Sequence, residues 1–216
     1  MGESALIKRR EDRINIDDFM EGLGPTPELS LASCQQLVDS RMATFQAFAV
    51  IEADKGFVSY PWDLRTPKGQ DISRLLFWRC VEEYAEAISA TSTEHVLEEL
   101  IDSFNYISAA LWAVDPNIAA EGLLAVLNSI KNFRQDPTGH RLGEIAYRLS
   151  NATELFRNRA WMHNAQSTYF DGMHIYCNAI FAVMIQIIEG FKDWDEFWRY
   201  FMAKDAVLQF RLHSHY

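Results

Sequence analysis

Apolar residues recur every three or four positions along most of the chain, which is the spacing of one buried face of an α-helix. Pro and Gly residues and short polar clusters separate the periodic stretches, and no stretch alternates as a β-strand does. The sequence therefore predicts an all-α helical bundle of about six to seven helices. The expected helices cover, approximately, residues 30–51, 75–89, 93–113, 116–132, 138–155, 168–190 and 193–216.

Residues 1–30 differ from the rest of the chain. Their first half is rich in charged residues, and two glycines and two prolines interrupt positions 22–27. The whole chain has 216 residues, of which 49% are hydrophobic, enough to bury one sizeable core. We predict an N-terminal arm over 1–30 and a single all-helical domain over 31–216.

Four carboxylates are arranged as two matched pairs in the second and third predicted helices. Glu83 and Glu86 form the first pair, and Glu99 and Asp102 form the second. Each pair has i, i+3 spacing, which places both side chains about one turn apart on neighbouring parts of a helix face. The polar residues 90–93 interrupt the apolar pattern between the pairs. A helical hairpin folded there would bring the two pairs face to face.

Like charges on one helix repel each other unless they are solvated or neutralised. The helices around these acids look too apolar for simple solvation, so unpaired carboxylates there would be costly. Mg²⁺ neutralises such a group well, because it prefers carboxylate oxygens, water and substrate phosphates as ligands. Glu82 and Glu98 point about 100° away from the neighbouring acids and are candidates to support the ligands.

Charge and cysteine content narrow the class of protein. The net charge is −10 at pH 7, and no basic block is present to neutralise nucleic acid or an anionic membrane. Three widely separated cysteines indicate neither a disulfide framework nor a zinc site. The N-terminus lacks the apolar core of a secretory signal, and the most apolar run, 179–188, is too short to span a bilayer. We predict a cytoplasmic protein with no nucleic-acid or membrane partner.

The order of the acids resembles a family motif. Glu83-x-x-Glu86, twelve residues and Glu99-x-x-Asp102 are similar to the ExxE…ExxD signature of the all-α nucleoside triphosphate pyrophosphatases, which include MazG-type enzymes and dimeric dUTPases. The resemblance implies hydrolysis of a deoxynucleoside triphosphate to the monophosphate and pyrophosphate. It also implies that these four acids are catalytic and bind Mg²⁺, with Mn²⁺ as a substitute, and that the chain is a homodimer.

The end of the chain carries a second resemblance. Lys204, Arg211 and Tyr216 keep the spacings of a Lys, an Arg and a Tyr in the closing segment of dimeric dUTPases, where these residues help to hold the substrate phosphates. The chain departs from that segment at Leu208 and Leu212, where the family usually has Asn and Gln. The alternative interpretation is that Lys204 and Arg211 only stabilise the C-terminal end of a helix through its dipole.

Four further residues are candidates for substrate contacts. Gln46 has the amide that a nucleobase pocket needs, although a surface glutamine is the simpler interpretation. Trp62 could stack on a base or pack on the core, and Lys68 could meet a phosphate from the loop that we expect over 60–69. Asn105, one turn after Asp102, could orient water or substrate or make a structural hydrogen bond.

Two questions stay open at this level. The C-terminal spacing slightly favours dUTP, whereas the residues flanking the acids look as much like the MazG-type branch, which accepts other or modified nucleotides. A different class also fits the same residues: a non-catalytic helical interaction module whose acids form a solvated or partner-facing surface. Metal binding distinguishes the two classes, because only a true site is stabilised by a divalent ion.

Overall fold

The computed structural model describes residues 16–51, 62–112, 119–154, 156 and 173–214. This part of the chain contains eight α-helices and no strand. The all-α prediction is confirmed, and the predicted count was one too low because Ile16–Glu21, inside the expected arm, forms a helix. The helices are α2 (Ile16–Glu21), α3 (Leu31–Ile51), α4 (Pro67–Ser89), α5 (Thr93–Trp112), α6 (Ala119–Ser129), α7 (Gly139–Thr153), α8 (Met173–Ile188) and α9 (Trp194–Ser214).

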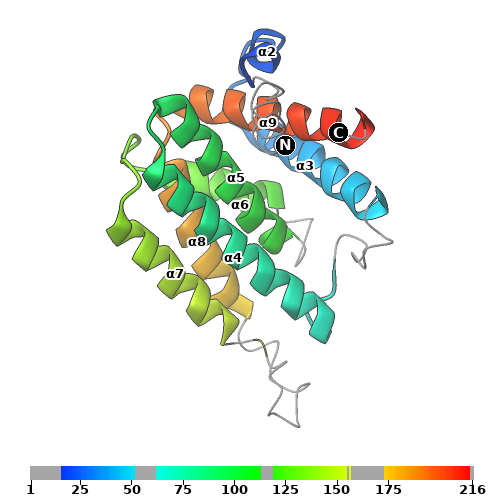
Figure 1. The fold of residues 1–216 in the computed structure, drawn as a ribbon, viewed down its shortest axis with the longest axis vertical. Coiled ribbons are helices and arrows are strands. Elements are labelled where there is room, and N and C mark those ends of the chain that lie inside the picture. Colours follow the sequence, from blue (N-terminus) through cyan, green and yellow to red (C-terminus); the bar gives the residue numbers. More distant parts are fainter. Residues whose placement is uncertain (1–15, 52–61, 113–118, 155, 157–172, 215–216) are drawn as a thin grey trace, which may run out of the picture.

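Helix α5 lies at the centre of the bundle. It packs along α4 as the second half of a hairpin, and it also contacts α8 and α9. Helix α7 covers α4 and α8, and α6 packs against α3 and α8. Helices α3 and α9 lie against each other at one end of the molecule, with α2 on α9 (Figure 1). None of the described helices is both long and apolar enough to cross a membrane.

Local signals explain where the central hairpin begins and turns. The Thr66 side chain accepts a hydrogen bond from the Gly69 backbone N–H, and Pro67 occupies the first turn, where its missing N–H costs nothing. Helix α4 therefore starts earlier than the sequence suggested, and the expected loop over 60–69 is wrong for its last three residues. At the turn, the Ser92 hydroxyl accepts from the His95 backbone N–H at the start of α5.

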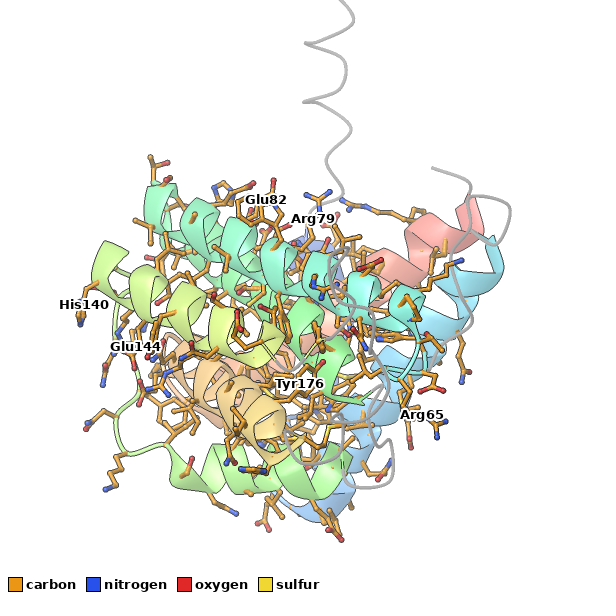
Figure 2. All side chains as sticks on the ribbon, turned by 90° about the horizontal axis from the view of Figure 1, so that it is seen from below. Arg65, Arg79, Glu82, His140, Glu144 and Tyr176 are labelled. Carbon is orange, nitrogen blue, oxygen red and sulfur yellow. The ribbon has the colours of Figure 1, made fainter. Side chains whose placement is uncertain are left out.

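Aromatic side chains connect α5 to the helices around it. The Phe104 ring packs edge-on against Phe197 and Phe201 of α9, with centroid distances of 5.1 and 6.0 Å. Tyr176 of α8 lies among the helices in Figure 2 and donates its hydroxyl to the Ala110 carbonyl of α5, at 3.0 Å. Each such buried side chain stabilises the fold by about 1.5–3 kcal/mol. Helix α5 is consequently held on several sides.

A buried ion pair joins α3 to α9. Arg41 Nε lies 3.3 Å from Asp205 Oδ1, and both side chains are 1% exposed. The guanidinium also lies over the rings of Phe45 and Phe201, at 5.7 and 5.0 Å from their centroids. Asp205 accepts further hydrogen bonds from Ser40, Thr44 and Gln209. Breaking a buried ion pair would leave a charge buried without a partner, which is unfavourable. This network therefore fixes how α3 and α9 pack against each other.

The start of α4 gives a stability prediction. A Cβ on Gly69 would lie 2.1 Å from the Asp63 carbonyl oxygen, so Gly69→Ala should lower the free energy of unfolding by about 1–3 kcal/mol. Gly143, inside α7, is the control because a Cβ there meets nothing within 4 Å. Gly143→Ala should raise the free energy by about 0.5–1 kcal/mol through helix propensity. Chemical denaturation measures the free energy of unfolding of both variants. Equal effects of the two substitutions would contradict the predicted clash at Gly69.

Candidate metal centre

The hairpin brings three of the four predicted acids together. Glu83 of α4 and Glu99 and Asp102 of α5 each offer a carboxylate oxygen, and these oxygens all lie within 4.8 Å of one another. All three side chains are partly buried, so bulk water only partly screens their repulsion. Carboxylate oxygens at this spacing are the donor set that a hard divalent cation prefers. The donor chemistry therefore fits Mg²⁺ or Mn²⁺.

Glu86, the fourth predicted ligand, does not join this cluster. Its side chain is exposed, and it is not among the carboxylates that share the 4.8 Å sphere. The reason is helical geometry: Cys80, Tyr84 and Ala87 form the buried stripe of α4. At 100° per residue, Glu83 lies about 70° from the centre of that stripe and Glu86 about 130° from it. Glu83 thus borders the α5 interface, whereas Glu86 faces away.

Glu82 also points away from the cluster. Its carboxylate pairs with Arg79 on the same helix, with Nη1 and Oε2 2.6 Å apart. Figure 2 shows both residues at the outer surface of α4. Among the described residues, the ion pair of Glu82 is with Arg79 and not within the acid cluster, so its expected support of a metal ligand stays a prediction.

Glu83 is the most perturbed acid of the cluster. Burial, followed by the charge of Asp102 and a hydrogen bond with Glu99, raises the pKa of Glu83 from 4.5 to about 8. At neutral pH the Glu83 carboxyl group therefore retains its proton, as expected when carboxylates are held close together in a partly dry site. A divalent cation would replace that proton, because it binds the deprotonated carboxylates.

Lys204 enters the site from a third element, α9. Its Nζ lies 2.7 Å from Asp102 Oδ2 and 4.0 Å from Glu98 Oε2, and its side chain is 12% exposed. Burial raises the pKa of Asp102, and the nearby Lys204 ammonium opposes that shift. The sequence singled out Lys204 for a phosphate contact, and the structure places it beside the acids. Its contact with phosphate stays a prediction.

His95 also contacts the site, although the sequence analysis assigns it no role. Its Nε2 lies 2.7 Å from Glu99 Oε1, one turn along α5. A histidine beside a metal-binding carboxylate usually fixes the orientation of that carboxylate. The signal was present in the sequence as an i, i+4 pair of His and Glu. It was overlooked because such pairs are common on exposed helices.

Arg41 is the second residue that the sequence reading missed. It lies on α3 in a row of buried positions that includes Leu37, Val38 and Thr44. Its Nη2 is buried and has no hydrogen-bond partner among the described residues. The Arg41 charge lowers the pKa of Asp102, although burial of that carboxyl has the larger, opposite effect. The signal for Arg41 in the sequence was its charge at a position where the helical pattern is otherwise apolar.

Asn105 follows Asp102 by three residues on α5, so helical geometry places the two about 60° apart around the axis. Its side chain is buried, at 5% exposure, and neither its amide oxygen nor its amide nitrogen has a hydrogen-bond partner among the described residues. A buried amide in this condition calls for a polar partner that the described chain does not supply. Of the C-terminal candidates, Arg211 is exposed on α9, and Tyr216 lies outside the described residues.

The remaining substrate candidates lie elsewhere. Gln46 is exposed on α3. Trp62 is buried and donates its indole N–H to Ser73 Oγ at 3.1 Å, which agrees with core packing rather than base stacking. Lys68 is exposed in the first turn of α4. The rise of a helix puts its backbone about 22 Å from that of Glu83, so it is not part of the acid cluster.

Comparisons with known proteins give no match for this chain, whether with protein-family models, curated proteins or solved structures. The functional argument therefore depends on the residues of this chain and on the motif that they resemble.

The raised pKa of Glu83 predicts how stability depends on pH without divalent ions. Because the folded-state pKa, about 8, lies above the ordinary 4.5, the folded chain holds the Glu83 proton more tightly than the unfolded chain does. The contribution of Glu83 to the free energy of unfolding is complete below pH 4.5 and is lost as the pH rises through 8. Over that range the free energy of unfolding falls by less than about 1.4 kcal/mol per pH unit. Denaturation from pH 5 to 9 measures it.

The control for this measurement is a pair of variants on α4. Glu83→Gln should flatten that part of the pH dependence, whereas Glu86→Gln, at an exposed acid one turn further on, should change it only slightly, because the Glu86 charge is the smallest cause of the raised pKa of Glu83. The same slope in the Glu83→Gln variant and the unmodified chain would assign the proton to another group.

Proposed function

We propose that this chain is a divalent-cation-dependent hydrolase that cleaves a deoxynucleoside triphosphate to the monophosphate and pyrophosphate. The observation that carries the proposal is the convergence of Glu83, Glu99 and Asp102 within 4.8 Å, from the two helices that hold the ExxE…ExxD motif. A solvated acidic surface does not require carboxylates to lie this close or one of them to hold a proton at neutral pH.

The residues of the site fit distinct parts of this reaction. Glu83, Glu99 and Asp102 would hold Mg²⁺ or Mn²⁺, and His95 would keep the Glu99 carboxylate in its orientation. The bound ion would neutralise phosphate charge and lower the pKa of a bound water. Positive charge from Lys204 beside the ion would favour an anionic substrate over a neutral one.

The identity of the base is the less supported part of the proposal. The spacing of Lys204, Arg211 and Tyr216 favours dUTP slightly, through its similarity to the closing segment of dimeric dUTPases. The alternative is a MazG-type activity on another or modified nucleotide. Asn105 supports a polar substrate contact in either case, because its buried amide has no partner among the described residues. The resemblance also leads us to propose a homodimer.

Two matched variants test whether the cluster performs the reaction. Glu83→Gln should lower kcat by about 100-fold or more, because charge stabilisation by a metal ion is worth several kcal/mol. Glu86→Gln removes the same charge from the same helix but outside the cluster, and it should lose much less. Steady-state pyrophosphate release with Mg²⁺ gives both numbers, and circular dichroism checks that the variants fold. Equal losses would mean that the fourth acid also binds the ion.

The substrate is identified by a panel of dUTP, dCTP, dATP, dGTP, dTTP and the ribonucleotides. Release confined to dUTP would establish a dUTPase, and release from another base would favour the MazG-type branch. An inactive protein whose melting temperature does not respond to Mg²⁺ would refute the hydrolase and favour the interaction module.

A further inference from the structure

Lys204 occupies a position that a cation would otherwise take. The short contact is with Asp102, which is one of the three clustered carboxylates, and Glu98 lies further away at 4.0 Å. Glu98 is also 33% exposed, against 24% for Asp102 and 12% for Glu99, so water solvates it more than it solvates these two acids. The Lys204 ammonium group therefore neutralises negative charge on the carboxylate cluster itself and not only on Glu98.

The charge of the site limits how many divalent ions it can hold. Glu83, Glu99, Asp102 and Lys204 carry a net charge of −2 when all are ionised. One divalent ion brings this group to neutrality, whereas two would leave it at +2 in a partly dry environment, which is unfavourable. Arg41 does not change the balance, because Asp205 pairs with it behind the site.

Position supports the same conclusion as charge. Lys204 lies on α9 next to Asp205, which is fixed in the buried network with α3. The lysine backbone is thus held close to the acids even when the side chain is released. Glu98, Asp102 and Asn105 follow each other in one row along α5, and the buried Asn105 amide has no partner among the described residues.

We propose that the site accepts one divalent ion, between Glu83 and Glu99. Lys204 takes the place of a second cation and stays paired with Asp102. This inference rests on the proposed function, because it assumes that the acids bind metal. It narrows the ligand set of that function: Glu83 and Glu99 would hold the single ion, and Asp102 would stay with Lys204, which stands where a second ion would bind. It also gives Lys204 a role in the absence of substrate.

The test counts bound Mn²⁺ on the full chain without nucleotide, by electron paramagnetic resonance of the free ion. The unmodified chain should bind one Mn²⁺, and Lys204→Met should bind two, because Asp102 is released for the second. Lys204→Arg keeps the positive charge and should bind one. Lys192→Met is the control, since it removes an exposed lysine that precedes α9, and it should also bind one.

Each result decides the inference. Two ions on the unmodified chain, or a single ion on folded Lys204→Met, would overturn it while the hydrolase proposal stands, provided that nucleotide hydrolysis needs the metal. No bound ion on the unmodified chain, together with no hydrolysis, would overturn both. If Lys204→Met does not fold, Lys204→Gln replaces it, and if neither folds, the count on the unmodified chain decides alone.

Discussion

The close approach of like-charged carboxylates between α4 and α5 is the constraint on which the site depends. The packing of the hairpin brings Glu83, Glu99 and Asp102 together, because their neighbours on both helices are buried apolar residues that hold the interface closed. Repulsion between the acids is relieved by a retained proton on Glu83 and by the Lys204 ammonium on Asp102. Core burial thus supplies the free energy that keeps the charges close.

Two cations with different properties surround this cluster. Lys204 has a flexible side chain with one short contact, so it can respond to what binds at the acids. Arg41 is fully buried, paired with Asp205 and covered by two aromatic rings, so it acts as a fixed positive charge. Lys204 is therefore the mobile counter-charge of the cluster, whereas Arg41 acts on Asp102 from a fixed position and has its own charge balanced by Asp205. This division would suit the proposed binding of a metal ion together with a substrate phosphate.

The sequence predicted the main architecture because the helices are long and strongly periodic. The breaks at residues 90–93 and at Thr138 were placed correctly, since polar capping residues mark both. Helix α2 was missed because six residues are too few for a clear period, and α4 began earlier than expected because Pro67 was taken as part of a loop. Proline was the ambiguous residue, since it suits both a loop and a first turn.

The site was predictable where the spacing alone decided the outcome. The pairing of α4 with α5 followed from the motif, but the outward direction of Glu86 depended on which face of α4 is buried. Lys204 was identified for phosphate, whereas its contact with Asp102 depends on how α9 crosses α5, which no local pattern encodes. Arg41 and His95 were visible as residue types, but their partners become identifiable only in three dimensions.

Because Lys204 and Asp205 are adjacent in the sequence, α9 connects the acids of α5 with the buried network on α3. One residue reaches the acids of α5, and the next holds Arg41 of α3 in the buried network. Helix α2, from the N-terminal segment, packs on the same helix (Figure 1). A displacement of α2 or α3 would therefore reach Lys204 through α9. The contacts of α9 thus connect the N-terminal helix α2 with the acid cluster.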